Sequence, residues 1–354
     1  MIPVTQFYKN KRILITGHTG FKGSWLALWL HKLGADVHGI ALPPYTQSDN
    51  FVLTDLAEKI QHTIADIRHR SRFYNLIQTI KPHIVFHLAA QPLVRYSYDH
   101  PLETFDTNVF GTINLLESLR LQNVDCTVVI ITSDKCYKNK EKSTGYRESD
   151  ELGGDDPYSA SKGATEIICN SYLKSFFHTE DKSGIRLATA RAGNVIGGGD
   201  WQKDRIIPDC IRSIESGVPI SIRNPESIRP WQHVLDPLHG YMMLAAALHS
   251  DPETFGGAWN FGPDESSHRT VLDLINLFHA TFGEGKWTTE KQRMSKHETG
   301  ILKLDNKKAG SILGWHPEID FRKSVDFTVK WYRNYKSCNM FHFAMEQIED
   351  YYST

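Results

Sequence analysis

The chain has 354 residues, more than one simple hydrophobic core requires, and this length predicts two packed lobes. Its 40 Lys and Arg residues balance 41 Asp and Glu residues, so charge gives no reason to expect a nucleic-acid partner or an anionic membrane surface. The five cysteines are irregularly spaced and the 17 histidines form no ligand pair with carboxylate support, so we expect neither a disulfide framework nor a metal site.

We expect no secretory leader and no membrane-spanning segment. Residues 1–11 are polar and run directly into a strand pattern, unlike a signal peptide. The longest apolar runs are far shorter than a bilayer requires. These features predict a cytoplasmic protein.

The first half of the chain alternates short apolar runs with helical patterns. The predicted strands are residues 12–16, 36–40, 83–88, 127–132 and 186–191. The predicted helices are residues 23–33, 71–80, 102–121 and a segment that begins at Tyr158. Such alternation predicts an α/β fold with a Rossmann-type, doubly wound parallel sheet.

The second half of the chain differs from the first in composition. A glycine loop at 197–200 is followed by a stretch rich in Pro, Trp and Arg that extends to residue 237. This stretch predicts a smaller, irregular lobe over the carboxyl ends of the strands, where ligands of such sheets bind. Residues 236–249 read as a helix that returns to the sheet, so we expect the smaller lobe to be interleaved with the larger one. Near the C-terminus an apolar stripe predicts a helix that docks on the protein itself, formed by Phe341, Phe343, Ala344, Met345 and Ile348.

A glycine-rich loop follows the first predicted strand and opens the first helix. Its residues are Gly17, His18, Thr19, Gly20, Phe21, Lys22 and Gly23. Glycines at this position allow backbone N–H groups to approach a pyrophosphate at the positive end of the helix. The placement between strand and helix therefore predicts a dinucleotide cofactor.

The choice between NAD and NADP rests on weaker signals. Residues 39–44, after the second strand, contain no Asp or Glu for the adenosine ribose and no Arg for a 2′-phosphate. We favour NAD. Asp66 and Ile67 follow the next apolar run, where Asp66 is either a contact for the adenine amino group or a solvated loop carboxylate.

Tyr158 and Lys162 are four residues apart at the start of a predicted helix, which places the phenol and the ammonium on one face. A phenol has an ordinary pKa near 10, so it acts as a base at neutral pH only beside positive charge. Lys162 and an oxidised nicotinamide would both supply such charge. Tyr158 could then take a proton from an alcohol while hydride leaves the same carbon. The plain alternative is a half-buried Tyr beside a solvated Lys.

Together these motifs resemble the extended short-chain dehydrogenase/reductase superfamily, whose members have Rossmann folds, use NAD(P) and act mainly on nucleotide sugars. The matching segments are 17–23, 66, 87–90, 108–112, 132–134, 158–162, 191–194, 304–305 and 313–315. The resemblance implies that Leu88, Ala89 and Ala90 line the cofactor path and that Asn108 supports the active-site end of its helix. Within the superfamily, residues 17–25, 91–95, 132–137 and 229–234 are most similar to the CDP-glucose 4,6-dehydratase family.

Such a dehydratase oxidises carbon 4 of a hexose, eliminates water across carbons 5 and 6, and returns hydride to carbon 6. The resemblance assigns the first base to Tyr158 with Lys162, which also holds the nicotinamide ribose. Ser133 would bind the carbon-4 oxygen and pass or steady its proton. Asp134 would protonate the departing carbon-6 hydroxyl, unless it only caps the strand end.

Lys135 departs from the family pattern, because related hexose dehydratases carry Glu at this position. A charged ammonium cannot take the carbon-5 proton, so Lys135 must be neutral in a dry pocket, or another group accepts the proton, or Lys135 only stabilises the enolate. If His18 and Lys135 both crowd the cofactor cleft, NAD would bind less tightly than in relatives with Gly or Glu there.

Residues for the nucleotide diphosphate and the hexose are expected from the smaller lobe and from the loop after the third predicted strand. By resemblance Asn194 contacts the pyrophosphate, and Arg229 and Arg205 could bind phosphate through their forked donors. A surface arginine is the alternative for each. Near the hexose the candidates are Gln91, Arg95 and Tyr96.

The sequence thus predicts an NAD-dependent lyase that converts CDP-D-glucose to the 4-keto-6-deoxy sugar, for deoxysugar synthesis in surface polysaccharide such as lipopolysaccharide O-antigen. We expect an NAD-binding domain at 1–192 with a returning segment at about 232–262, and a nucleotide-sugar lobe and tail at 193–231 and 263–354. A homodimer through the helices of 102–121 and of Tyr158 is implied by the resemblance. The rivals are an epimerase or reductase of the same superfamily, which has no use for Asp134 and Lys135, and a dinucleotide sensor without catalysis.

Overall fold

A computed structural model describes residues 4–142, 144–177, 184–289 and 302–352. Its centre is a seven-stranded sheet in the order β11-β6-β5-β4-β1-β2-β3, and every neighbouring pair is parallel. The strands are β1 (Arg12–Thr16), β2 (Asp36–Ala41), β3 (Gln61–Ile64), β4 (Ile84–His87), β5 (Cys126–Ile131), β6 (Ile185–Arg191) and β11 (Gly257–Asn260). The chain order reverses between β1 and β4, which confirms the predicted doubly wound α/β fold.

The five predicted strands are present, whereas β3 and β11 were not predicted. The central strands are apolar throughout because both faces of a parallel sheet are covered, and all six residues of β5 are buried. β3 lies at the sheet edge and has the polar sequence Gln-His-Thr-Ile with no fully buried residue. β11 spans only four residues of the other edge. Short or polar edge strands lack the apolar run from which strands are recognised.

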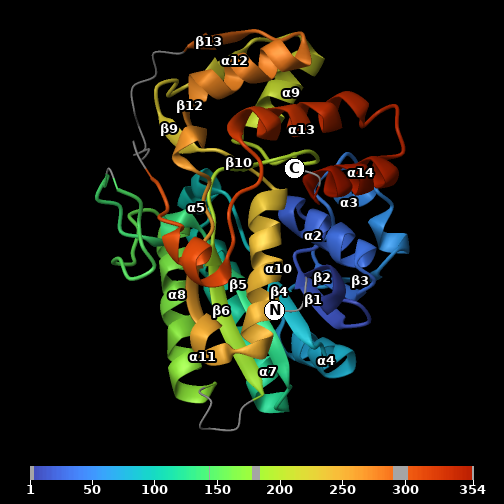
Figure 1. Cartoon of the computed structure of the whole chain (residues 1–354), viewed down its shortest axis with the longest axis vertical. Helices are drawn as coiled ribbons and strands as arrows, with labels where there is room; N and C mark the ends of the chain where they lie inside the picture. The colour runs from blue at the N-terminus through green and yellow to red at the C-terminus, as the bar shows by residue number, and fades with distance from the viewer. Residues whose placement is uncertain (1–3, 143, 178–183, 290–301, 353–354) are drawn as a thin grey trace.

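Helices cover both faces of the sheet, as Figure 1 shows. Their buried side chains form one hydrophobic core on each face. Ile13 and Ile15 point to the face packed by α2 (Phe21–Lys32) and α10 (Leu235–Ser250), whereas Leu14 points to the other face. The helices of that second face are α4 (Arg70–Ile80), α7 (Gly111–Gln122) and α8 (Pro157–Phe176).

The predicted helix at 102–121 is not uniform. It consists of α6 (Pro101–Phe105), a π-helical turn over Asp106–Phe110, and α7. Such turns occur often at functional sites. Asn108 lies in this turn, and its side chain reaches two neighbouring segments described below.

The smaller lobe lies above the sheet in Figure 1. Its main helices are α9 (Ile206–Ser216), α12 (Val271–Phe282) and α13 (Phe321–Asn334). Its short strands are β8 (Ile220–Ile222), which pairs with β13 (Trp287–Thr289), and β9 (Ile228–Pro230), which pairs with β12 (His268–Thr270). Between the lobes β7 (Val195–Ile196) pairs with β10 (Gln232–His233), and the chain then returns to the sheet through α10.

The C-terminal stripe forms α14 (Met340–Tyr352), which packs against α2. Trp29 Nε1 donates to Tyr352 Oη at 3.0 Å, and Ala344 and Ile348 are fully buried. The predicted docking helix is therefore confirmed. The remaining short helices are α1 (Val4–Phe7), α3 (Asn50–Leu53), α5 (Val94–Asp99) and α11 (Pro252–Phe255). In the described ranges, every helix falls short of the length and apolarity needed to cross a membrane.

Candidate active site

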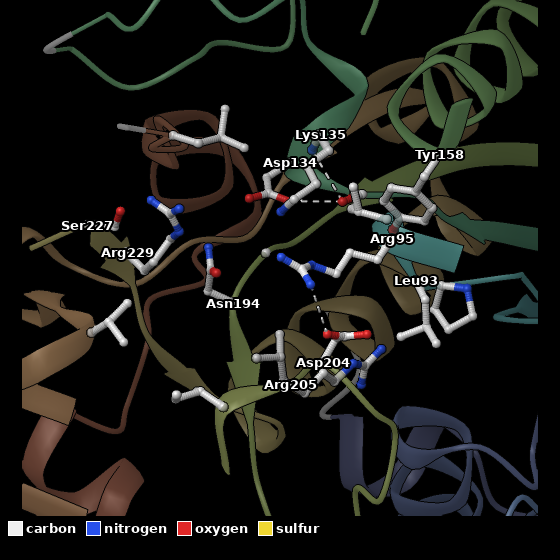
Figure 2. A pocket seen from close by; sticks show the side chains of 18 of the residues that line it. Leu93, Arg95, Asp134, Lys135, Tyr158, Asn194, Asp204, Arg205, Ser227 and Arg229 are labelled. Carbon is white, nitrogen blue, oxygen red and sulfur yellow. Dashed lines mark hydrogen bonds and ion pairs between the residues drawn. The ribbon is translucent and has the colours of Figure 1, made fainter. Parts of the chain in front are cut away.

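A cavity of about 470 Å³ lies over the carboxyl ends of the strands and is lined by both lobes (Figure 2). Ser133, Asp134 and Lys135 line it from the turn after β5, and Tyr158 lines it from the start of α8. Asn194 and the segments 205–209 and 220–224 contribute from the smaller lobe. The cavity therefore lies where ligands of doubly wound sheets bind.

The turn after β5 brings three polar side chains together. Ser133 Oγ donates to Asp134 Oδ1 at 2.8 Å and accepts the backbone N–H of Lys135 at 3.2 Å, which starts a short 3₁₀ turn. Lys135 Nζ lies 3.5 Å from Asp134 Oδ1, and its side chain is one-third exposed. This geometry unites the predicted Ser133, Asp134 and Lys135.

Asp134 is 1% exposed, and its Oδ2 atom has no hydrogen-bond partner among the described residues. Gly193, at the end of the β6 segment, lies directly against this carboxyl. A Cβ atom on Gly193 would lie 2.1 Å from Asp134 Oδ2, far inside van der Waals contact. The fold therefore depends on glycine here to leave room for the Asp134 side chain.

The start of α8 fixes Tyr158. Asp156 caps the helix by accepting the N–H of Ser159 at 2.9 Å, and Pro157 occupies the first turn. The N–H of Tyr158 donates to Ser97 Oγ at 3.2 Å. Burial raises the pKa of the Tyr158 phenol to about 12. The Ser133 hydroxyl and the Arg205 guanidinium partly oppose this rise, because both favour the phenolate.

Lys162 lies one turn further along α8 and is buried. Its Nζ atom donates to the carbonyl of Ile131, at the end of β5, at 3.3 Å. Burial lowers the pKa of Lys162 to about 8, and Glu166 partly opposes this shift. Arg205 is a neighbouring cation that lowers the pKa of Tyr158, whereas the Lys162 ammonium is directed towards the carbonyl at the end of β5. The activation of Tyr158 by Lys162 stays a prediction.

Behind Lys162 lies a buried ion pair that the sequence did not reveal. Arg191 Nη2 and Glu166 Oε2 are 2.7 Å apart, and their side chains are 3% and 2% exposed. Thr189 donates to Glu166 Oε2 at 2.7 Å, Thr132 donates to Glu166 Oε1, and Arg191 Nη1 donates to Tyr137 Oη at 2.6 Å. This network ties α8 to the ends of β5 and β6.

The glycine loop has the shape that a dinucleotide requires. Gly17 has φ +79°, and a Cβ atom there would lie 2.7 Å from the backbone nitrogen of Ala89. A Cβ atom on Gly23 would lie 2.2 Å from the Gly17 carbonyl oxygen. The first turn of α2 begins at Phe21, at the carboxyl edge of the sheet, and the first N–H groups of a helix have no partner within it, a fit for a pyrophosphate.

Lys22 and His18 of the glycine loop have different surroundings. Lys22 lines the cavity, and burial lowers its pKa to about 7, helped by the neighbouring Arg205. His18 is fully buried: its ring packs against Gly39 of β2, and its Nε2 lies 2.7 Å from His62 Nδ1. His18 therefore packs beneath β2 and β3, and its effect on NAD affinity stays a prediction.

The other predicted cofactor residues lie along the same edge. Leu88, Ala89 and Ala90 are partly exposed just beyond β4, and Ile67 is buried against Gly111. Asp66 is bound by Arg68, whose Nη2 lies 2.7 Å from Asp66 Oδ2, so a contact to adenine would share this carboxylate.

Asn108 connects two segments at the edge of the active site. Its Oδ1 accepts the N–H of Gln91 at 2.8 Å, and its Nδ2 donates to Ser161 Oγ of α8 at 2.9 Å. The π-helical turn thereby connects the loop after β4 to the helix that carries Tyr158. This geometry agrees with the supporting role that the resemblance implied.

The predicted substrate residues divide into two groups. Asn194, Arg205, Arg229 and Arg95 line the cavity. Asn194 adopts φ +48° and its Nδ2 has no hydrogen-bond partner in the described structure, so this amide is available to a ligand. Arg205 pairs with Asp200 at 2.7 Å, and Arg95 lies 3.7 Å from Asp204.

Gln91 and Tyr96 do not line the cavity. The Gln91 amide is buried and donates to Leu93 O and Thr104 Oγ1, and the Tyr96 hydroxyl donates to Glu103 at 2.7 Å. Tyr98 lines the cavity instead of Tyr96. α5 starts at Val94, and the two tyrosines lie on different faces of this helix, which the sequence alone did not predict.

The sequence profile of the family described as GDP-mannose 4,6 dehydratase matches residues 14–328. The chain belongs to this family. It is also 45% identical over 351 residues to CDP-glucose 4,6-dehydratase of Salmonella typhimurium, and the match covers 98% of each chain. The predicted resemblance is confirmed.

More distant relatives of this dehydratase-family chain have other activities. CDP-paratose 2-epimerase of Salmonella typhi is 26% identical over 90% of this chain and 98% of its own. Among solved structures, UDP-glucose 4-epimerase of Thermus thermophilus in complex with NAD superposes with a TM-score of 0.77 at 22% identity, covering 91% of this chain and 99% of its own. That likeness shows the shared fold.

Several cavity residues of this dehydratase-family chain were missed from sequence. The segment 220–224 and Ser227 lie in a region that reads as irregular, and no motif marks them. Trp231 lies in the segment 229–234 that carries the resemblance, but it was not singled out as a site residue. Asp200 follows three glycines, a signal that could have identified it. Within the described residues no group of three His, Cys, Asp or Glu side chains is placed to hold a metal ion.

Proposed function

We propose that this chain is an NAD-dependent 4,6-dehydratase whose substrate is CDP-D-glucose and whose product is CDP-4-keto-6-deoxy-D-glucose. The 45% identity to a CDP-glucose 4,6-dehydratase, over nearly the whole of both chains, carries the proposal. The site supports the same reaction type, because Asp134 offers an acid beside Tyr158, and a dehydration needs one for its leaving hydroxyl.

The cofactor would lie along the carboxyl edge of β1 and β4. Its pyrophosphate would face the glycine loop and the start of α2, and Asp66 and Ala89 would flank its path. Bound NAD would accept hydride from carbon 4 and return it to carbon 6. Its oxidised ring would also place positive charge near Tyr158, whose pKa of about 12 in the free chain is too high for a base at neutral pH.

The side chains take the remaining roles. Tyr158 takes the proton of the carbon-4 hydroxyl, and the Ser133 hydroxyl holds the same oxygen. Asp134 protonates the carbon-6 hydroxyl as it leaves. The proton of carbon 5 passes to another group of the cavity, which returns it to carbon 5 after hydride has reached carbon 6. Lys135, beside Asp134, stabilises negative charge on the enolate that exists in between.

The nucleotide diphosphate would lie in the smaller lobe. Asn194 offers an amide without a partner among the described residues, and Arg205 and Arg229 offer positive charge from two sides of the cavity. Ser227 and Arg229 lie together at the far side of the cavity from Tyr158 in Figure 2. The extended ligand would therefore have its hexose at Tyr158 and its base near the segment 220–224.

We also propose a cytoplasmic homodimer that supplies deoxysugars for surface polysaccharide. The described structure leaves large apolar side chains exposed on α6, on the π-helical turn and on α8: Leu102 is 85% exposed, and Phe110 and Ile167 are each 58% exposed. A second copy of the chain would cover them. Light scattering of the Ile167→Glu variant tests this, since a monomer is expected where the parent is a dimer.

The activity is tested by incubating the purified protein with CDP-glucose, dTDP-glucose or GDP-mannose, each with and without NAD. Formation of a 4-keto-6-deoxy sugar is followed by its absorbance in alkali. Product from CDP-glucose alone is the expected result, and dependence on added NAD would indicate a loosely bound cofactor. No product from any of the three substrates with NAD bound would overturn the proposal.

A further inference from the structure

Two arginines from opposite lobes meet at one carboxylate in the cavity. Arg95 belongs to α5 of the larger lobe, and Arg223 directly follows β8 of the smaller lobe. Arg95 Nη1 lies 3.7 Å from Asp204 Oδ1, and Arg223 Nη2 lies 3.4 Å from the same oxygen. All three side chains line the cavity, and Figure 2 marks the contact between Arg95 and Asp204. Asp204 therefore joins the two lobes through a pair of ionic contacts.

Both contacts of Asp204 are loose. Their distances exceed those of a good charge-assisted hydrogen bond, and the side chains of Arg95, Asp204 and Arg223 are 42%, 41% and 30% exposed. Within the described residues, neither arginine has another hydrogen-bond or ion-pair partner. A guanidinium carries several N–H donors in a fixed fork. Most of the donors of each fork are therefore available to a ligand.

A second carboxylate of the same loop is bound much more firmly. Asp200 Oδ2 lies 2.7 Å from Arg205 Nη1, and the Asp200 side chain is 6% exposed. Breaking such a buried pair leaves an uncompensated charge, whereas an exposed pair contributes little to stability and is screened by solvent. Of the two carboxylates, Asp204 is therefore the one that a ligand can displace from its arginines.

A phosphate is a better partner for Arg95 and Arg223 than Asp204 is. It presents several charged oxygens, and a forked guanidinium binds two of them at once. Asp204 offers both arginines a single oxygen at long distance. Its negative charge would also repel a phosphate bound beside it. An anionic ligand of the cavity would therefore take the two arginines from Asp204.

Resting on the proposed function, we infer that Asp204 is a temporary counter-ion, which holds Arg95 and Arg223 in the protein without substrate and releases both to a phosphate of the nucleotide diphosphate. The substrate then joins the two lobes in place of Asp204. When the product leaves, Asp204 binds the arginines again. This exchange of partners lowers the affinity for every nucleoside diphosphate that enters the cavity, and it thereby favours product release.

Two other roles of Asp204 predict different results. Asp204 could stay paired in the complex and position the two arginines for the phosphate, in which case its removal weakens binding of the diphosphate. It could instead accept a hydrogen bond from a ribose hydroxyl, in which case its removal weakens binding of the nucleoside as well. The exchange predicts tighter binding of the diphosphate and no change for the nucleoside.

The experiment measures the dissociation constants of CDP and of cytidine with the NAD-loaded protein. CDP is titrated by calorimetry, and cytidine is measured by its competition with CDP. The test variant is Asp204→Asn, because Asn tolerates the left-handed backbone of this position, φ +59°. Asp326→Asn is the matched control: the Asp326 side chain is 39% exposed and pairs with Lys330 at 2.9 Å on α13, outside the cavity.

Asp204→Asn should lower the dissociation constant of CDP by roughly 3- to 10-fold and leave that of cytidine within about twofold of the parent. Asp326→Asn should change neither constant. Weaker binding of CDP by Asp204→Asn would show that Asp204 positions the arginines or binds the ribose, and the cytidine result separates these two roles. Either outcome, or unchanged binding of CDP, would overturn the exchange.

A second set of variants tests whether the gain arises at the two arginines. Asp204→Asn is added to the double variant Arg95→Met, Arg223→Met, or to Arg95→Met alone if the double variant binds CDP too weakly to measure. The gain in CDP affinity should then fall to less than half of the gain in the parent. An undiminished gain would show that Asp204 only repels the phosphate across the cavity, which would also overturn the exchange.

Failure of the proposed substrate gives a different result. If dTDP, UDP or GDP binds in place of CDP, the substrate is wrong, and the same comparison is made with the nucleotide that binds. A parent that binds none of the four nucleoside diphosphates would overturn both proposals. Product formation from CDP-glucose together with unchanged CDP binding in Asp204→Asn would overturn the exchange alone.

Discussion

Two clusters of charged and polar side chains lie at the end of β5, and they differ in how completely their buried carboxylate is hydrogen-bonded. The closed cluster consists of Glu166, Arg191, Thr132, Thr189 and Tyr137, and both carboxylate oxygens of Glu166 accept hydrogen bonds within it. The open cluster consists of Ser133, Asp134, Lys135 and Tyr158. There Asp134 Oδ2 has no partner among the described residues, although Asp134 is as deeply buried as Glu166.

Burial alone therefore does not separate a structural carboxylate from a reactive one. A buried pair with complete hydrogen bonding holds elements together, because breaking it leaves an unpaired charge in a low-dielectric interior. A buried carboxyl with a free oxygen beside a cavity retains capacity for a ligand or a proton. The two clusters should accordingly respond to mutation in different observables.

The largest expected effect is on catalysis in the open cluster. Tyr158→Phe removes the base and should lower kcat by roughly 10²–10⁴-fold. Tyr137→Phe in the closed cluster is the matched control: it loses the hydrogen bond that the hydroxyl accepts from Arg191 and the one that it donates to Asn260. It should lower stability by about 1–3 kcal/mol, with a much smaller effect on kcat. Rates of 4-keto sugar formation and urea unfolding of both variants check this. Similar losses of kcat in the two variants would show that the open and closed clusters do not differ in their role in catalysis.

The next effect is on stability in the closed cluster. Arg191→Leu leaves Glu166 buried without its cation and should reduce the free energy of unfolding by about 3–5 kcal/mol. Arg186→Leu is the control, because Arg186 pairs with Asp125, whose side chain is 75% exposed, and should cost about 0–1 kcal/mol. Urea unfolding measures both. Equal losses would show that burial of the pair does not determine its contribution.

A smaller loss of kcat is expected at Gly193, which lies against the Asp134 carboxyl. Gly193→Ala forces a methyl group against Asp134, so kcat should fall by about tenfold or more while binding of the nucleotide diphosphate changes little. The double variant with Asp134→Ala tests the cause. If the methyl group acts through the carboxyl, adding Gly193→Ala to Asp134→Ala should produce almost no further loss in kcat. If the two losses in kcat add, the methyl group does not act through the Asp134 carboxyl.

The smallest effect concerns a third buried carboxyl, which lacks a cation. Asp236 is fully buried and accepts the N–H of Glu318 at 2.9 Å, and burial raises its pKa to about 7. Because the folded-state pKa is raised, the stabilising protonated form is present at low pH and is lost as the pH rises towards 7. Asp236→Asn should therefore match the parent near pH 4 and exceed its stability by about 4 kcal/mol at pH 8. Urea unfolding across this range checks the sign, and a variant that is less stable at pH 8 would contradict it.

Local sequence determined much of the fold and part of the site. Apolar runs alternating with helical patterns predicted five parallel strands, because buried strands and amphipathic helices leave direct periodic signals. The glycine loop and the Ser133–Lys135 and Tyr158–Lys162 motifs were also found, since each lies within a few consecutive residues at the end of a strand or the start of a helix.

Contacts between distant segments were decided only by the tertiary structure. Gly193 against Asp134, the ion pair of Glu166 with Arg191, and His18 under Gly39 each join residues more than 20 positions apart, and no local pattern encodes their distance. Likewise the choice of Tyr98 over Tyr96 depends on how α5 is rotated against its neighbours. The sequence alone determined which chemical groups are present, and packing determined which of them are paired and which remain open to a ligand.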